Sequence, residues 1–455
     1  MKKVGFCAVS GSGMSALAQV LRFKGVEVFG SDRSFDQGKD VKNKEALTSV
    51  GIKIYPQDGS MFENEIETLY VSSAVEDTIP DVRRAKELNV DIKKRSDLLA
   101  EIFSQYKYNI AVGGTSGKST VTAMIGYILD KLDKRPLVIN GAILKNYEDQ
   151  KGIPNVILND GGYCVIEADE SDGSIEKYNP YISVINNITL DHKPIDELKV
   201  LFTDFAKRAQ KGVVYNKDCV NSRVLEDINL NALSFSIKDE TADFYAKNIT
   251  PLADGTQYEF QGKEYKLSLI GAFNVANAMC AVATCYLLGI LPDEACKVLQ
   301  SFQGAKRRLE VLGQKSGITV IDDFAHNPDK VLASMSALKS YEGRLLIMFQ
   351  PHGFKPMRLM GKELIESFVS KMSDDDILLI PEIFFSGGSA VKDISSNDLV
   401  NHAVSFNKKA FFFEKRDELY QYLLNIAQAG DRIVLMGARD NSITDMGYSF
   451  LEALK

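Results

Sequence analysis

Short apolar runs alternate with amphipathic stretches over most of the chain, and this alternation predicts strands and helices in turn. An apolar run at residues 3–9 leads into a glycine turn, Gly11-Ser-Gly13-Met-Ser15, and then into a helical pattern through Val20. The alternation continues with expected strands at 26–30 and 68–72 and expected helices at 80–88 and 98–103. A polar stretch at 106–109 ends this unit, so we predict a first α/β domain over residues 1–106.

The same pattern predicts two further α/β domains, over residues 107–303 and 304–455. Strands of the second are expected at 110–112, 163–166, 182–185 and 212–215. Residues 242–269 alternate polar and apolar side chains, which indicates an antiparallel excursion, and 274–288 is strongly helical. Strands of the third are expected at 318–321, 345–349, 376–380, 410–413 and 432–436. Strands that alternate with helices imply mainly parallel sheets, with ligands at the carboxyl ends of the strands.

Composition narrows the class of protein. The chain has 455 residues, 45% of them hydrophobic and 25% charged, which is typical of a globular protein with more than one domain. The net charge of −7 argues against a nucleic-acid partner. The longest nearly apolar run, 281–291, is shorter than the roughly 20 residues of a membrane span. Six scattered cysteines without zinc-site spacing indicate reduced thiols, and we expect a cytoplasmic protein.

The strongest chemical signal is a phosphate loop, Gly114-Thr-Ser-Gly117-Lys118-Ser119-Thr120, between an expected strand and an expected helix. Backbone N–H groups at a helix N-terminus cradle phosphate, a lysine neutralises it, and a hydroxyl coordinates magnesium. Val112 stands where the strict pattern has glycine, so a plain surface turn is the alternative. We expect the Lys118 side chain to be exposed at this loop, and the domain to be of the P-loop type.

Acidic residues follow two other expected strands. Glu167 begins a run with four acids in six residues, which is either a solvated loop or, beside a phosphate loop, a source of magnesium ligands. His192 follows Asp191 at a second strand end, where a lone histidine is usually structural unless it lies beside such a site. Asp32 lies about twenty residues beyond the first glycines, where nucleotide-binding units often place an acid on a ribose.

The order and spacing of these motifs resemble the Mur ligases, which add amino acids or peptides to the peptidoglycan precursor. The resemblance spans nearly the whole chain and is carried by Gly11-Ser-Gly13-Met14-Ser15, Gly30-Ser31-Asp32, Ser72-Ser-Ala-Val75, the phosphate loop, Glu167-Ala-Asp-Glu-Ser-Asp172, Asn187-Ile-Thr-Leu-Asp-His192, Gly271-Ala-Phe-Asn274-Val-Ala-Asn277, Lys306-Arg307-Arg308, Asp322-Asp-Phe-Ala-His326-Asn-Pro328 and Phe349-Gln-Pro-His352. It implies an N-terminal Rossmann-like domain for a UDP-sugar, a central ATPase, and a C-terminal Rossmann-like domain for the amino acid.

The resemblance also implies a reaction and roles for individual residues. The lactyl carboxylate of UDP-N-acetylmuramate attacks the γ-phosphate of ATP, and the amine then displaces phosphate from the acyl phosphate. Lys118, His192 and His326 would be catalytic, and Ser119, Glu167 and His192 would hold Mg²⁺. The ATP site would comprise Gly114, Thr115, Ser116, Gly117, Lys118, Ser119 and Thr120, with Asn277 for adenine, Arg308 for phosphate and Asp323 for ribose. The UDP-sugar site would comprise Gly11, Ser12, Gly13, Met14, Ser15, Asp32 and Ser73.

The chain departs from the family where the amino acceptor should bind. Its segment His352-Gly353-Phe-Lys355-Pro-Met-Arg358 lacks an arginine common in alanine-adding members, which leaves His352, Lys355 and Arg358 as the expected acceptor residues. L-alanine is the expected acceptor, and a tripeptide, as in the recycling branch of the family, is the alternative. A non-catalytic nucleotide-binding paralogue and a simple ATPase or GTPase are two further alternatives. We expect small-molecule substrates, no nucleic-acid or membrane partner, and a monomer or homodimer.

Overall fold

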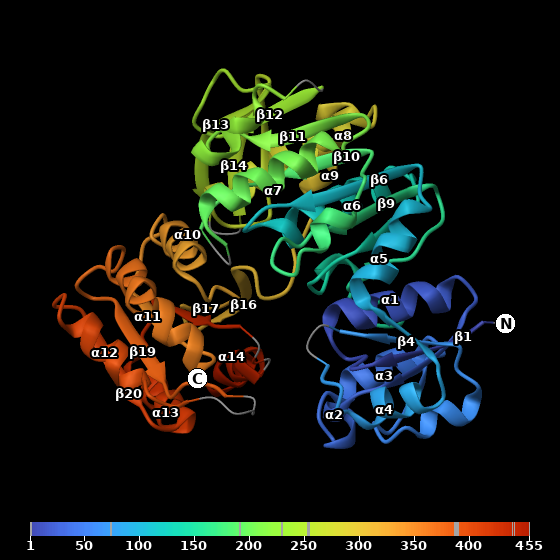
Figure 1. Ribbon diagram of the computed structural model, residues 1–455. Helices are drawn as coiled ribbons and strands as arrows, with labels where there is room; N and C mark the ends of the chain where they lie inside the picture. Colours follow the sequence, from blue (N-terminus) through green and yellow to red (C-terminus); the bar gives the residue numbers. More distant parts are fainter. Residues whose placement is uncertain are drawn as a thin grey trace. The chain divides into compact units, whose positions relative to one another are not determined.

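The computed structural model describes residues 2–72, 75–190, 193–228, 231–252, 255–385, 391–438, 440 and 442–454. Packing divides the chain into two compact units. The first comprises Met1–Asn248, Tyr258–Tyr265 and Ala276–Ala305, and the second comprises Ile249–Gln257, Lys266–Val275 and Lys306–Lys455. Three sheets, each accompanied by helices, make up the α/β fold that the sequence predicts (Figure 1).

The N-terminal sheet has five parallel strands in the order β3-β2-β1-β4-β5. The central strand, β1, is buried from Val4 to Cys7, which explains why its sequence is a continuous apolar run. The strands are β1 Lys3–Cys7, β2 Glu27–Ser31, β3 Lys53–Tyr55, β4 Thr68–Val71 and β5 Asp91–Lys94. The helices are α1 Ser12–Phe23, α2 Arg33–Asp36, α3 Val41–Ser49, the 3-10 helix η1 Ser60–Asn64, α4 Pro80–Glu87 and α5 Arg95–Ser104.

The central sheet has ten strands in the order β15-β14-β13-β12-β11-β10-β6-β9-β7-β8. From β13 to β7 the neighbours are parallel, so the carboxyl ends of these strands lie along one edge. The strands are β6 Tyr108–Gly113, β7 Leu137–Ile139, β8 Val156–Ile157, β9 Tyr163–Glu167, β10 Ile182–Ile185, β11 Gly212–Asn216, β12 Ala232–Ser236, β13 Phe244–Leu252, β14 Gly255–Phe260 and β15 Lys263–Leu267. The helices are α6 Lys118–Lys131, η2 Lys145–Tyr147, η3 Ser174–Lys177, α7 Ile195–Lys207, η4 Val220–Leu225, α8 Ala272–Leu287 and α9 Pro292–Leu299.

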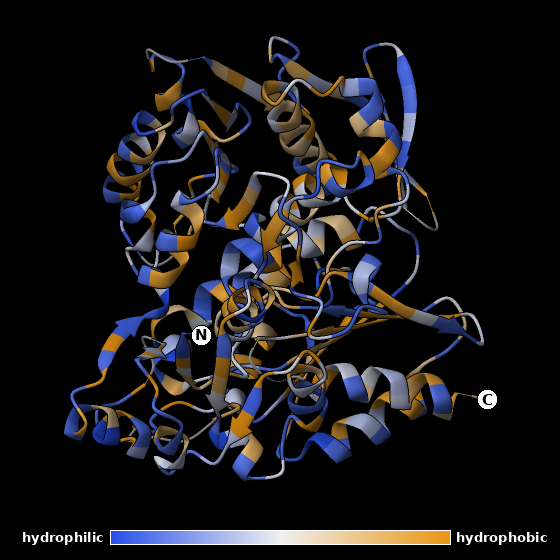
Figure 2. Ribbon diagram, turned by 90° about the vertical axis from the view of Figure 1, so that its right-hand side faces the viewer, coloured by the Kyte–Doolittle hydropathy of each residue, from blue (hydrophilic) through white to orange (hydrophobic). Residues whose placement is uncertain are grey.

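The C-terminal sheet has six strands in the order β16-β17-β21-β18-β19-β20, parallel except for β16. The edge strand β16 is a strand that the sequence pattern does not indicate. The strands are β16 Glu310–Lys315, β17 Ile318–Asp323, β18 Leu345–Phe349, β19 Ile377–Pro381, β20 Lys409–Phe413 and β21 Arg432–Met436. The helices are α10 Pro328–Leu338, α11 Phe354–Val369, α12 Ser396–Val404, α13 Arg416–Ile426 and α14 Ser442–Ala453. Hydrophilic and hydrophobic residues lie side by side on many helices, as expected where one face packs against a sheet (Figure 2).

A buried polar interlock joins helix α1 to the segment before β8 within the first unit. Gln19 is 1% exposed, and its side chain donates to the Ile153 carbonyl (3.2 Å) and accepts from the Ile153 N–H (2.8 Å). Gln19 Nε2 also donates to Asn155 Oδ1 (3.1 Å), and Asn155 Nδ2 donates to the Ser12 carbonyl (2.8 Å) and Ser15 Oγ (3.1 Å). Every buried group in this set has a partner, so the interlock holds the start of α1 firmly on the central sheet.

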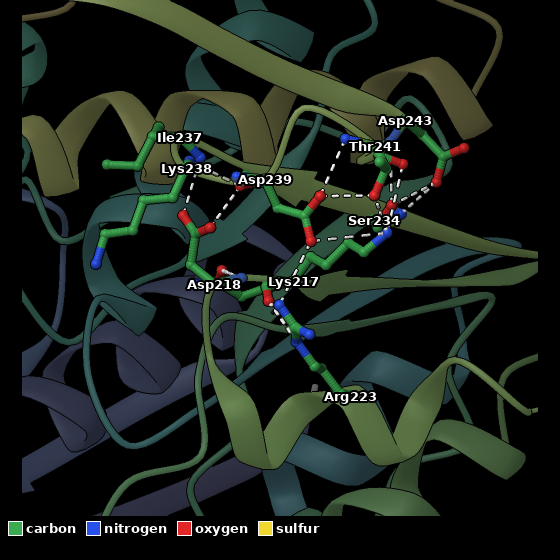
Figure 3. A network of polar contacts seen from close by, with 11 residues as sticks. Lys217, Asp218, Arg223, Ser234, Ile237, Lys238, Asp239, Thr241 and Asp243 are labelled. Carbon is green, nitrogen blue, oxygen red and sulfur yellow. Dashed lines mark hydrogen bonds and ion pairs between the residues drawn. The ribbon is translucent and has the colours of Figure 1, made fainter.

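A second polar network occupies the carboxyl ends of β11 and β12 (Figure 3). Lys217 Nζ donates to Thr241 Oγ1 (2.6 Å), and Asp218 accepts from Ser236 Oγ (2.5 Å) and the Ile237 N–H (2.9 Å). Arg223 Nε closes the group by donating to the Lys217 carbonyl (3.0 Å). These side chains therefore stabilise the loops that follow β11 and β12.

Among the described residues, no helix combines the length and apolar character needed to cross a membrane. All six cysteines are free thiols, and all but Cys219 are buried, as the sequence indicates.

Candidate functional site

The phosphate loop connects β6 to α6 at the carboxyl edge of the central sheet, and two of its glycines are required by its geometry. Gly114 and Gly117 have φ angles of +133° and +80°, in the region that favours glycine. A Cβ atom on Gly117 would lie 2.2 Å from Asn186 Nδ2, so a larger residue would also displace its neighbour. Gly117 is the N-cap of α6, and the loop thus presents the N-terminus of this helix.

Two asparagines at the end of β10 hold the loop from the neighbouring strand. Asn187 Oδ1 accepts from the Ser116 N–H and from Thr115 Oγ1, both at 2.8 Å. Asn186 Nδ2 donates to the Ser116 carbonyl (3.0 Å) and to Asn277 Oδ1 (3.0 Å). Neither asparagine was among the predicted site residues, although their position at a strand end is a signal that could have identified them. Asn277, predicted to read adenine, is thereby brought to the loop from α8.

The structure corrects the expectation that the Lys118 side chain is exposed. Only 16% of it is accessible, and Nζ donates to the Gly114 carbonyl (2.7 Å) and to Glu170 Oε2 (2.6 Å). Burial acts to lower the pKa of Lys118, but the carboxylates of Glu170 and Asp169 outweigh it, so the pKa is raised and the lysine is charged. Glu170 is almost fully buried, and no single-residue role was predicted for it.

Ser119 and Glu167 lie together as the magnesium prediction requires. Ser119 Oγ, in the first turn of α6, donates to Glu167 Oε2 (3.0 Å) at the end of β9. Glu167 Oε1 accepts from the Gly141 N–H (2.5 Å), which fixes the carboxylate. Hydroxyl and carboxylate oxygens suit a hard cation, so this pair fits Mg²⁺ that is also bound by phosphate. Within the described ranges, no group of three or more His, Cys, Asp or Glu side chains forms a metal cage by itself.

The predicted UDP-sugar residues divide into two groups. Gly11 and Ser12 are exposed at the N-terminus of α1, whereas Met14 and Ser15 are buried, Ser15 against Asn155. Met14 and Ser15 are therefore part of the packed interior, and their contact with the UDP-sugar stays a prediction.

Asp32 also has structural partners, because it accepts from the backbone N–H groups of Ser10 and Ser34, both at 2.9 Å. It caps α2 and ties the glycine turn to the end of β2. The predicted residues Ser73 and His192 lie outside the described residues.

The remaining predicted ATP residues belong to the second unit. Arg308 lies over the ring of Phe324, with its guanidinium carbon 4.9 Å from the centroid. Asp323 is buried and accepts from Ser334 Oγ (2.5 Å) and the Leu309 N–H (3.3 Å), and burial raises its pKa. These internal contacts give Asp323 a structural role, and its bond to ribose stays a prediction.

Two predicted histidines lie together at the carboxyl ends of β17 and β18. The ring centroids of His326 and His352 are 5.4 Å apart. Burial, together with the positive charge of Lys330, lowers the pKa of His326 to about 3, so the ring is neutral at physiological pH. Its Nδ1 lies 2.9 Å from the Phe324 carbonyl oxygen, which assigns the proton to Nδ1 and leaves the lone pair on Nε2.

The predicted acceptor residues Lys355 and Arg358 are both exposed on α11. Arg358 Nε donates to Asp393 Oδ1 (2.9 Å), and Nη2 donates to the Val391 carbonyl (3.2 Å). The guanidinium already holds a carboxylate, which is the type of group that an amino acid would offer it.

Parallel sheets, a phosphate loop and a paired hydroxyl and acid define this chain as a nucleotide-dependent α/β enzyme. Three family models match it in order: the Mur ligase family, catalytic domain, over residues 3–107; the Mur ligase middle domain over 112–285; and the Mur ligase glutamate ligase domain over 307–439. The chain belongs to the Mur ligase family. It is therefore an ATP-dependent, ADP-forming ligase that acts on small molecules.

Several named relatives match nearly the whole chain. The UDP-N-acetylmuramate–L-alanine ligase of Syntrophomonas wolfei is 31% identical over 469 residues, covering 100% of this chain and 97% of the relative. The enzyme of the same name from Clostridium kluyveri is 33% identical over 458 residues, covering 96% of each chain. The crystal structure of UDP-N-acetylmuramate–alanine ligase from Thermotoga maritima superposes with a TM-score of 0.81 at 25% identity, covering 99% of both chains. A murein peptide ligase from Psychrobacter arcticus shares the fold, with a TM-score of 0.69 at 20% identity.

Proposed function

We propose that this chain joins L-alanine to UDP-N-acetylmuramate in the synthesis of peptidoglycan precursors. The observation that carries the proposal is the full-length match to relatives of that named activity, above 30% identity, in a chain that keeps the phosphate loop and its acid partner. Because two of the proposed substrates, ATP and UDP-N-acetylmuramate, are nucleotides, we place the reaction in the cytoplasm.

The first step brings two anions together, the lactyl carboxylate and the ATP triphosphate. A carboxylate oxygen attacks the γ-phosphorus, the bond to the β–γ bridging oxygen breaks, and ADP leaves. Lys118 and the N-terminus of α6 lower the repulsion between these anions because they supply positive charge at the phosphates. Ser119 and Glu167 would hold Mg²⁺, which would screen the phosphate charge when bound.

The second step forms the amide. The nitrogen of the neutral amine attacks the acyl carbon, the bond between that carbon and the phosphate oxygen breaks, and the nitrogen's proton ends on the departing inorganic phosphate. With a pKa of about 3, His326 is too weak a base to take that proton efficiently. Its Nε2 lone pair instead suits it to accept a hydrogen bond from an N–H of the incoming amine, which makes it a residue for orienting that amine.

Product analysis tests the proposal. Purified protein with ATP and magnesium is given UDP-N-acetylmuramate and, separately, each free amino acid and the tripeptide, and product masses are read. We expect phosphate release that depends on both the sugar nucleotide and L-alanine, with a product heavier by one alanine residue. A tripeptide adduct as the only product would assign the chain to the recycling branch, and nucleotide hydrolysis without any adduct would reject a ligase.

We also propose the three domains 1–106, 107–303 and 304–455 as functional parts for the UDP-sugar, ATP and the amino acid. Limited proteolysis checks these boundaries, because cleavage of a folded protein concentrates in exposed connections. Cuts clustered near residues 106 and 304 are expected. Size-exclusion chromatography with light scattering would decide between the monomer and the homodimer.

A further inference from the structure

An arginine lies between the two substrate-binding segments of the first unit. Arg95 is the first residue of α5, directly after β5. A methyl group built on Gly13 would lie 2.9 Å from Arg95 Nη1 and 3.0 Å from its Cδ. The guanidinium therefore packs against Gly13 in the first turn of α1, within the segment of residues 11–15 that we call the glycine turn.

The other side of the same guanidinium binds the acid loop (residues 167–172). Arg95 Nη2 donates to Asp172 Oδ2 at 3.0 Å, and Asp172 Oδ1 accepts from the Ser174 N–H at 2.9 Å. Both partners are about three-quarters buried, with 25% and 24% of their side chains exposed. The acid loop also carries Glu167, which binds Ser119, and Glu170, which binds Lys118.

Docking of the two sheets does not depend on this contact. The buried interlock of Gln19 with Ile153 and Asn155 already joins α1 to the central part. A second ion pair, from Lys177 Nζ to Asp97 Oδ1 at 2.5 Å, also links α5 to the segment after the acid loop. What distinguishes Arg95 is its position, because Lys177 contacts neither the glycine turn nor the acid loop in any contact described for it.

We propose that Arg95 is a positioning residue that couples the glycine turn to the acid loop. It thereby holds the sugar nucleotide in register with the ATP phosphates. This inference rests on the proposed function, in which the first site binds the UDP-sugar and the second binds ATP. Phosphoryl transfer needs the attacking oxygen at about 3 to 3.5 Å from phosphorus and in line with the leaving group, so small displacements of either loop slow the reaction.

The test compares four single variants, one of them a control, and the Arg95→Gln, Asp172→Asn double variant in the full chain. Arg95→Gln and Asp172→Asn should each lower kcat about tenfold, while the KM for the amino acid stays within about twofold. The kcat of the double variant should be no lower than the kcat of the less active single variant, because the two side chains act as one unit. Arg95→Lys, which keeps the charge, should recover part of the loss. The matched control, Lys177→Gln, should keep kcat within about twofold of the wild type, because it removes an exposed pair of little energetic weight.

Hydrogen exchange gives a readout that does not depend on turnover. In Arg95→Gln, amides of residues 11–15 and 167–172 should exchange faster, while in Lys177→Gln they should exchange as in the wild type. If the losses multiply in the double variant, if Lys177→Gln loses as much activity, or if exchange is unchanged in Arg95→Gln, the coupling is refuted. A wild type that forms no ADP with UDP-N-acetylmuramate and L-alanine would reject the proposed function, and the exchange data would still decide the coupling.

Discussion

Replacing Lys118 with alanine has two separable consequences. The ammonium that faces the phosphate site is lost, and removal of one such electrostatic group lowers kcat by about 100- to 1,000-fold, or about 3 to 4 kcal/mol. The substitution also leaves Glu170, whose side chain is 2% exposed, without its partner at 2.6 Å. A buried carboxylate that loses its cation destabilises a protein by about 3 to 5 kcal/mol. Lys118→Ala should therefore be both inactive and less stable.

A second variant separates the two effects. In Lys118→Met with Glu170→Met, both charged side chains are replaced by apolar ones of similar length, which is often neutral for a buried pair. For a domain of the size of the proposed central one (residues 107–303), each kcal/mol shifts the thermal midpoint by about 2 to 4 °C, so Lys118→Ala should melt at least about 6 °C below the wild type. The double variant should recover most of that difference and remain inactive. ADP release in a coupled assay and thermal unfolding followed by circular dichroism are the two measurements.

Two results would refute this reasoning at different points. Activity of Lys118→Ala within about threefold of the wild type, with normal circular dichroism, would remove the phosphate-loop assignment. An unchanged thermal midpoint in Lys118→Ala would show that Glu170 is not held by the lysine. A double variant that is as unstable as the single one would show that the loss comes from packing and not from the charge.

Four further predictions concern other parts of the site. Gly13→Val should weaken binding of UDP-N-acetylmuramate about tenfold, because its side chain displaces Arg95, and should leave ATP binding within about twofold, as measured by calorimetry. Glu167→Gln should raise the magnesium concentration at half-maximal activity by more than it shifts the pH profile, because the carboxylate acts through metal; an unchanged magnesium titration would contradict this. Arg358→Lys should raise the KM for the amino substrate about tenfold and leave the other KM values within about twofold, because the planar guanidinium that can bind a carboxylate at two points is replaced by a single ammonium group. An unchanged KM for the amino substrate would assign Arg358 to its contact with Asp393 alone. His326 is one of four histidines, so the NMR signal lost in His326→Gln identifies it. That signal should not titrate between about pH 5 and 8, since the depressed pKa keeps the ring neutral there. Because the folded pKa lies below the unfolded one, the stability contributed by neutral His326 is present above about pH 6.5 and is lost as pH falls toward 3.

The sequence predicted the framework of the fold well because local signals define it. Apolar runs buried on both faces, such as β1 and β18, are continuous in the sequence, and the glycine turns interrupt them at recognisable points. The strand β16 was missed, because an exposed edge strand with a bulge between Val311 and Gly313 has no regular alternation. Burial alone does not make a strand recognisable, because β7 (Leu137–Ile139) is fully buried and was also missed, being only three residues long.

The sequence predicted which residues belong to the site better than it predicted the contacts between them. That Ser119 and Glu167 would lie together at a magnesium site was implied by the resemblance to the Mur ligases. The partner of Lys118 was not, because three further acids follow Glu167, the last residue of β9, and nothing in their order shows that Glu170 reaches back to the lysine. The same holds for Asp323, whose burial depends on the packing of Ser334 and Leu309 around it.

The interlock between α1 and the central sheet bears on how such enzymes can be recombined. Residues 105–107 connect α5 to β6, and by sequence alone this polar connection is an attractive junction for a chimera with a related ligase. A foreign N-terminal part without glutamine at position 19 would bury the Ile153 amide and carbonyl without partners, which destabilises a protein by about 1 to 3 kcal/mol for each group. Exchange of the N-terminal part should therefore succeed only when Gln19 and residues 153–155 come from the same parent protein. The part that must be exchanged as a whole is thus larger than the N-terminal sheet and its helices.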